Sequence, residues 1–120
     1  MKRRAKGSAT WKRKEADKLF SLIIRSPGFC TECGTTENLQ CAHGFSRRYR
    51  SIRWNEANAF CLCRGCHMRF THRPLEWDDW IRGRWGDDLY AWLRSAALDI
   101  TTKVDVDAVL LRLQDRHAEI

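Results

Sequence analysis

The chain has no apolar run that approaches the ~18 residues needed for a membrane-spanning helix. The longest one near the start, Leu19–Ile24, is interrupted by Ser21. The first residues are basic but lack an apolar stretch beside a small-residue cleavage site, so they do not resemble a secretory signal. Repeats and low-complexity tracts are also absent. These absences predict a globular protein of the cytoplasm with no membrane partner.

The length of 120 residues is too short for two or three full domains, and 43% hydrophobic residues are enough for a packed core. We therefore predict one compact domain with three parts. Residues 1–26 form a basic arm and an N-terminal helix, residues 27–74 form the core, and residues 75–120 form a helical C-terminal part.

Acidic residues are too few to balance the basic ones, since 22 Lys and Arg face 15 Asp and Glu for a net charge of +7. The excess lies in residues 1–25 and residues 47–73, whereas the remaining segments are net acidic. All basic residues of the second segment are arginines, whose planar donors bind phosphate oxygens in pairs. The charge distribution predicts an anionic partner.

Hydrophobic periodicity predicts an α+β fold. A helix is expected from an N-cap at Thr10 to Pro27–Gly28. Two short strands are expected at Leu39–Ala42 and Ala59–Leu62, and a helix at Arg64–His72 follows the second strand. Three further helices are expected in the tail, at Leu75–Arg82 before Gly83, at Asp87–Leu98 and from Asp105. The tail's four tryptophans, at helical spacing, are expected in the core.

The six cysteines all lie in the middle of the chain, and four of them form two Cys-x2-Cys pairs, Cys30 with Cys33 and Cys63 with Cys66. Four thiolates from two such pairs satisfy tetrahedral zinc. The lack of a secretory signal argues against disulfides. We predict a structural zinc, because a closed four-thiolate site leaves no open position for substrate. Cys41 and Cys61 are expected to be small buried residues.

Three histidines and an asparagine lie between and after these cysteine pairs: His43, Asn58, His67 and His72. His43 follows the first expected strand, Asn58 precedes the second, and His67 comes directly after Cys66. The segments Leu39-Gln-Cys-Ala-His-Gly44 and Asn58-Ala-Phe-Cys-Leu-Cys-Arg-Gly-Cys-His67 resemble the HNH endonuclease family. They are most similar to its phage and prophage members, such as the recombination nucleases of the NinG (Rap) type. The resemblance spans roughly Phe29 to Trp92.

This resemblance implies a zinc-stapled ββα-metal core that hydrolyses DNA phosphodiester bonds in phage or prophage DNA processing, in the bacterial host cytoplasm. His43 would be the general base, for which the near-neutral pKa of imidazole is suited. Asn58 would hold the connecting loop and orient His43. His67 would bind one catalytic divalent ion, which is Mg²⁺, Mn²⁺, Ni²⁺ or Zn²⁺.

Two positions depart from the family pattern. Many members carry a metal ligand just before the catalytic histidine, where this chain has Ala42. Many carry a second helix ligand four residues after the first, where this chain has Thr71, and His72 lies about 140° around an ideal helix from His67. Either His43 is itself a ligand and another group activates water, or His67, His72 and water hold the ion.

Arginines cluster between the expected strands. Four of them follow the proposed base, and two more on the next helix would extend a phosphate-binding track: Arg47, Arg48, Arg50, Arg53, Arg64 and Arg69. The alternative for the first four is a charged surface loop without a ligand.

Two other functions are consistent with the sequence. Ala42 favours a non-catalytic, zinc-stabilised module that binds nucleic acid without cutting it. The acidic, tryptophan-rich tail would instead suit an adaptor that binds proteins. The oligomeric state stays open between a monomer and a homodimer, since cutting both strands requires two subunits or two events.

Overall fold

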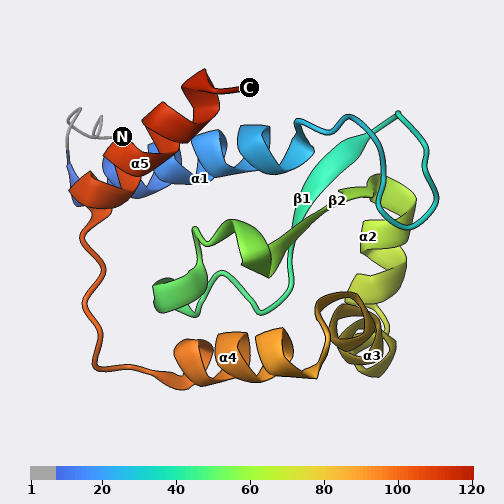
Figure 1. Ribbon diagram of the computed structural model, residues 1–120. Helices are drawn as coiled ribbons and strands as arrows, with labels where there is room; N and C mark the ends of the chain where they lie inside the picture. The colour runs from blue at the N-terminus through green and yellow to red at the C-terminus, as the bar shows by residue number, and fades with distance from the viewer. Residues whose placement is uncertain (1–7) are drawn as a thin grey trace, which may run out of the picture.

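The computed structural model describes residues 8–120 as a two-stranded antiparallel sheet surrounded by five α-helices (Figure 1). The elements are α1 (Ala9–Arg25), β1 (Leu39–His43), the short 3₁₀ helices η1 (Arg50–Ile52) and η2 (Glu56–Asn58), β2 (Ala59–Cys63), α2 (Arg64–Thr71), α3 (Pro74–Trp85), α4 (Asp87–Leu98) and α5 (Val106–Ala118). The predicted α+β class is confirmed. The basic arm at Lys2–Lys6 lies outside the described residues.

Strands β1 and β2 pair in a register that sets Leu39 opposite Cys63 and His43 opposite Ala59. Each strand is one residue longer than the sequence predicted, and α2 follows β2 without a break. The predicted order of two strands and a helix is therefore confirmed. None of the helices within residues 8–120 has the length and apolar character required to cross a membrane.

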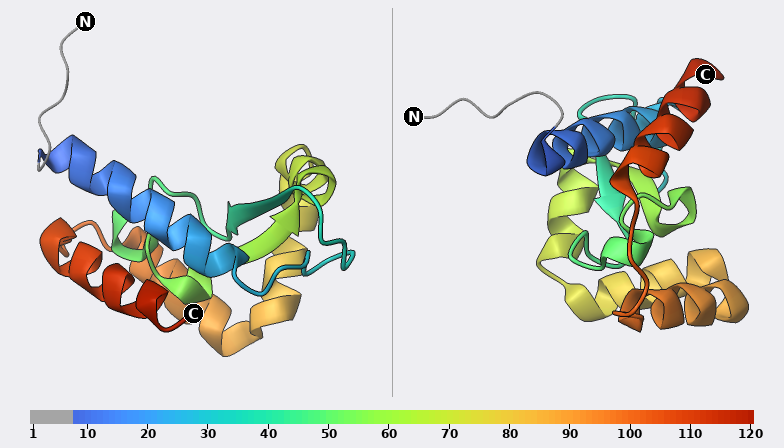
Figure 2. Two further views of the ribbon diagram at one scale, coloured as in Figure 1. Left: turned by 90° about the horizontal axis from the view of Figure 1, so that it is seen from above. Right: turned by 90° about the vertical axis from the view of Figure 1, so that its left-hand side faces the viewer.

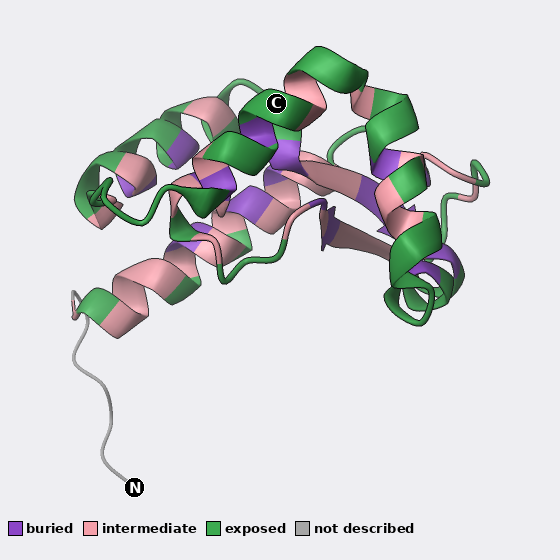
Figure 3. Cartoon of the chain, turned by 90° about the horizontal axis from the view of Figure 1, so that it is seen from below, coloured by how far each residue is buried: buried purple, intermediate pink, exposed green. Residues whose placement is uncertain are grey.

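Helix α1 lies along one side of the sheet with α5 against it (Figure 2). The buried faces of the two helices meet around Trp54, and the cluster consists of Ala16, Phe20, Ile23, Trp54, Leu110 and Leu113 (Figure 3). The predicted N-cap at Thr10 is wrong. The hydroxyl of Ser8 accepts from the amide of Trp11, so α1 begins one residue before Thr10.

An aromatic cluster fills the space between β2, α2 and α3. It consists of Phe60, Phe70, Trp77, Trp80 and Trp85, with the Trp77 and Trp80 rings stacked 5.2 Å apart. Helix α3 does not stop at Gly83 as predicted but continues to Trp85, and Gly86 ends it with φ of 80°. The prediction of a core position is wrong for Trp92, which is 58% exposed.

Gly44 follows β1 at a point where two tryptophans meet the backbone. A Cβ atom there would lie 2.5 Å from the Cζ2 of Trp85 and 3.1 Å from the Oδ1 of Asn58. The indole Nε1 of Trp77 donates to the Gly44 carbonyl over 2.9 Å. Only a residue without a side chain fits between β1 and Trp85.

We predict that Gly44→Ala lowers the free energy of unfolding by about 1–3 kcal/mol, because the new methyl group overlaps the Trp85 ring. Gly83→Ala is the matched control. Its Cβ would meet nothing within 4 Å, and alanine in the α3 interior should stabilise by about 0.5–1 kcal/mol. Urea denaturation of both variants measures the difference, and equal stability of Gly44→Ala and wild type would contradict the packing described.

Candidate metal centre and histidine groove

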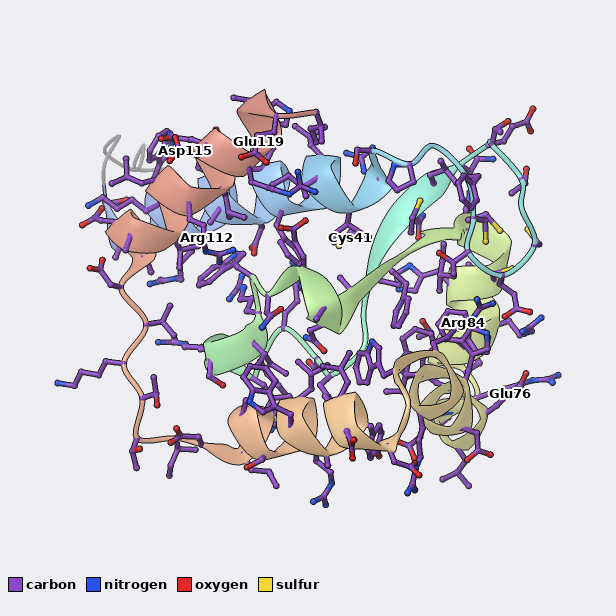
Figure 4. All side chains as sticks on the ribbon, viewed as in Figure 1. Cys41, Glu76, Arg84, Arg112, Asp115 and Glu119 are labelled. Atoms are coloured by element: carbon purple, nitrogen blue, oxygen red, sulfur yellow. The ribbon has the colours of Figure 1, made fainter. Side chains whose placement is uncertain are left out.

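The two Cys-x2-Cys pairs come together at one end of the sheet, where sulfur atoms gather near the start of α2 (Figure 4). The Sγ atoms of Cys30, Cys33, Cys63 and Cys66 all lie within 4.8 Å of one another, and those of Cys33 and Cys63 are 3.7 Å apart. A tetrahedral zinc with bonds of ~2.3 Å separates its thiolates by ~3.8 Å. The cluster could hold a structural metal ion such as zinc.

Local backbone structure presents each pair as a tight turn. Gly34, with φ of 79°, closes the first turn, and its amide donates to the Cys30 carbonyl over 2.9 Å. Cys63 caps α2, since its Sγ accepts from the amide of Cys66. The amide of Cys33 donates to the Sγ of Cys30 in the same way. Such amide donors stabilise thiolates, the form that binds metal.

The four thiols do not ionise alike. Burial opposes ionisation of Cys30, but backbone hydrogen bonds outweigh it and bring its pKa to about 6. Burial, and then the neighbouring cysteines, raise the pKa of Cys66 above its usual value. One negative charge in the cluster therefore discourages others unless a cation is present, so metal binding should release protons.

His43 ends β1 with its ring against Phe20, 5.3 Å between centroids. Its Nε2 lies 2.9 Å from the Arg53 carbonyl, which can only accept, so Nε2 carries the hydrogen and Nδ1 is the unprotonated nitrogen. Burial lowers the pKa of His43, opposed by the Arg53 hydrogen bond, and Arg47 nearby lowers it further. His43 is thus a neutral imidazole with one nitrogen held in place.

His67, on α2, is held in the opposite tautomer. Its Nδ1 lies 2.7 Å from the Oε1 of Gln40, so Nδ1–H donates and Nε2 keeps its lone pair. Burial lowers the pKa of His67 as well, which favours the neutral form that binds metals. The sequence reasoning missed Gln40. Its position on β1, three residues before His43, gives no signal without the strand–helix geometry.

Asn58 is fully buried and its side chain bonds to the loop between the strands. Its Oδ1 accepts from the amide of Phe45 over 2.8 Å, and its Nδ2 donates to the carbonyls of Phe45 and Ile52. These bonds hold the loop, as expected from the family resemblance. The imidazole of His43, however, is hydrogen-bonded to the backbone carbonyl of Arg53 and not to Asn58.

A groove of about 560 Å³ joins both histidines to α1. Its lining includes Gln40 and His43 of β1, His67 of α2, and Asp17, Ser21 and Arg25 of α1. Cys41 faces the groove beneath α1 (Figure 4), and burial raises its pKa to about 12, so its thiol stays protonated. Cys61 is buried as predicted, whereas Cys41 is only half-buried.

Of the six predicted phosphate-binding arginines, only Arg47 lines this groove. The guanidinium of Arg53 forks onto the carboxylate of Asp17, with Nε 3.0 Å from Oδ1, so it is already neutralised. Arg69 pairs with Glu76 at 3.6 Å. Arg48 and Arg50 line a different cavity, and Arg64 lines a third. The sequence reasoning did not single out Arg25, which lies in the groove.

His72 is exposed at the end of α2 and shares a cavity with Gln40, Arg64 and His67. It does not line the groove with His43. Apart from the four cysteines, no three His, Cys, Asp or Glu side chains within residues 8–120 converge as a metal-binding group. Ala42, at the position of the usual family ligand, is buried.

No protein-family model, curated protein or solved structure matches the chain.

We predict that Cys30→Ser with Cys66→Ser abolishes metal binding and unfolds the central region, because two of four ligands are lost. Elemental analysis and thermal melting measure the two effects. Cys41→Ala is the control, since Cys41 lies outside the cluster, and it should keep about one metal ion per chain. Unchanged metal content and melting temperature in the double variant would contradict a structural metal site.

Proposed function

We propose that the chain is a metal-dependent endonuclease of the HNH type that hydrolyses DNA phosphodiester bonds. The observation that carries the proposal is a pair of histidines in one groove with two arginines, each imidazole held through one nitrogen and free at the other. The strand–strand–helix order and the resemblance of residues 29–92 to the family support it.

His43 is the general base of this proposal. Its Nε2–H is fixed on the Arg53 carbonyl, so Nδ1 accepts the proton of the attacking water. Because burial keeps the ring neutral, the base is ready at neutral pH. The Arg53 carbonyl also disperses the positive charge that forms on the ring when it is protonated.

His67 holds the catalytic divalent ion through Nε2, and Gln40 orients it from the other side of the ring. A single imidazole nitrogen suits Ni²⁺ or Zn²⁺ better than Mg²⁺, which prefers oxygen ligands, and the ion would take its remaining ligands from water and the phosphate. Such an ion stabilises negative charge on the phosphoryl oxygens and the leaving group. Mg²⁺ and Mn²⁺ are the other candidates. His72, the second ligand considered from the sequence, would have to reach the ion from the neighbouring cavity that it shares with His67.

Arg25 and Arg47 contact the phosphate in the groove. The Nε of Arg25 bonds to the hydroxyl of Ser21 over 3.0 Å, which leaves the guanidinium nitrogens at its tip for phosphate oxygens. Arg47 lies 3.8 Å from Asp17 and is largely exposed, so its fork remains available. Together they supply the positive charge that the sequence predicted for a loop of four arginines.

Zinc in the cysteine cluster is structural in this proposal. It fixes the segment before β1 to the start of α2, on which His67 lies one residue after Cys66. The biological setting would be phage or prophage DNA processing or recombination in the host cytoplasm. Two subunits, or two successive events, would cut both strands.

A second candidate is a zinc-stabilised module that binds nucleic acid without cutting it. It is favoured by Ala42, which is buried and offers no ligand, and by the lack of a second three-ligand group among the described side chains. An adaptor role for the tail is less well supported, since Trp77, Trp80 and Trp85 pack internally.

We expect wild-type protein to nick supercoiled plasmid or branched DNA with at least one of Mg²⁺, Mn²⁺, Ni²⁺ and Zn²⁺. His43→Ala should lower the rate by about 10²–10⁴-fold, since it removes the general base. His117→Ala is the matched control, because His117 lies in the last turn of α5, outside the groove. Equal cleavage by His43→Ala would overturn the assignment of His43 as the base. No cleavage by wild type with any of these ions would overturn the nuclease proposal and leave the non-cutting module.

The pH profile of cleavage gives an independent test of His43. A protonated imidazole cannot accept a proton, so the rate should fall as pH decreases through the pKa of His43, which burial holds below 6.5. We therefore expect a plateau above pH 6.5 and an acid limb below it. The acid limb should lie at the same pH with different ions, because it reports the pKa of His43. If a metal-bound water were titrating instead, its pKa would change with the metal. An acid limb centred above 6.5 would contradict this assignment.

A further inference from the structure

A second basic cavity lies apart from the histidine groove. It measures about 510 Å³ and shares no lining residue with the groove. Three segments far apart in sequence supply its cations: Arg13 from α1, Arg48 and Arg50 from the loop after β1, and Lys103 from the segment between α4 and α5. None of these four takes part in the proposed chemistry.

The positive charge of this cavity exceeds the negative charge that the described residues place in it, four cations against the one carboxylate of Asp99. Within residues 8–120, no carboxylate forms an ion pair with Arg13, Arg48, Arg50 or Lys103, whereas Arg53, Arg82 and Arg116 all have acidic partners. Asp99 is the only acidic residue that lines the cavity. Its carboxylate already accepts from the hydroxyls of Thr101 and Thr102 and from the amide of Thr101.

The cations are arranged for an extended anion. The Arg48 guanidinium lies 5.8 Å from the centroid of the Tyr49 ring, and Arg13 makes a long contact of 3.4 Å to Thr10, so neither is held by a carboxylate. Arginine forks bind phosphate oxygens in pairs. Because the four charges come from three segments spread around one concavity, successive phosphates of a polymer satisfy them better than one small anion.

Helix α1 connects this cavity with the groove. Arg13 lies at one and Arg25 at the other, and a helix with a rise of ~1.5 Å per residue separates them by ~18 Å. The neighbouring residues Arg47 and Arg48 likewise divide between the two. The two sites therefore adjoin at Arg47 and Arg48, whereas the span from Arg13 to Arg25 corresponds to about five nucleotides of one DNA strand at ~3.4 Å each.

We propose that the cavity formed by Arg13, Arg48, Arg50 and Lys103 is a second binding site for the sugar–phosphate backbone of DNA, next to the groove. It rests on the proposed function for the identity of the polymer. It adds a contact that anchors the duplex away from the reacting phosphate.

The test is duplex binding by Arg13→Ala with Lys103→Ala, measured by fluorescence anisotropy on a labelled duplex of about 20 base pairs, which covers both sites. All variants carry His43→Ala, and no divalent ions are added, so that the DNA stays intact during the measurement. Arg82→Ala with Arg94→Ala is the control, which removes the same charge from α3 and α4. Thermal melting verifies that both double variants are folded.

We expect the Arg13/Lys103 variant to bind about three- to tenfold more weakly, as for exposed ion pairs, and the control to bind like the parent protein. The dependence of log affinity on log salt should become shallower by ~1.8 for two lost phosphate contacts. An equal loss in both variants, an unchanged slope, or no duplex binding by the parent would overturn the proposal. If these changes occur but no ion supports cleavage, the second site stands and the nuclease proposal fails.

Discussion

A hairpin of two five-residue strands is too small to be stable in water by itself. The strands β1 and β2 therefore depend on the helices and the cysteine cluster that pack around them. The histidine groove requires the end of β1 to be fixed relative to α2. Three supports provide this: the cysteine cluster at one end, the aromatic cluster beneath, and α1 above. The helices therefore hold the two strands of this small sheet in position.

The carboxylate of Asp17 connects α1 with the loop that returns to β2. It accepts from the guanidinium of Arg53 and from the indole of Trp54, the latter over 2.9 Å. The carbonyl of the same Arg53 holds the ring of His43. Arg53 is therefore bonded through its side chain to α1 and through its backbone carbonyl to His43, which connects helix α1 with the imidazole.

Local patterns in the sequence predicted the cysteine cluster and most of the secondary structure. The cysteine spacing predicted the cluster, and alternating turn residues and short apolar runs predicted both strands and the helix after them. The contacts that depend on long-range packing were not predictable. Gln40 meets His67, and Arg53 meets Asp17, only because separate elements pack together. Helix α3 continues through Gly83 because Trp85 is needed against Gly44, which outweighs glycine's weak helix propensity.

The packing of α1 against α5 has a consequence for the order in which the molecule assembles. These helices are separated by all of residues 26–105, so their contact closes the longest loop in the structure. The hairpin, the cysteine turns and α2 involve shorter separations and should form earlier. Helix α1 also meets the sheet directly, since the Phe20 ring lies 5.3 Å from that of His43, and this contact closes a much shorter loop. The walls of the histidine groove can therefore come together before α5 docks, and the last helix then fixes α1 in a position it already holds.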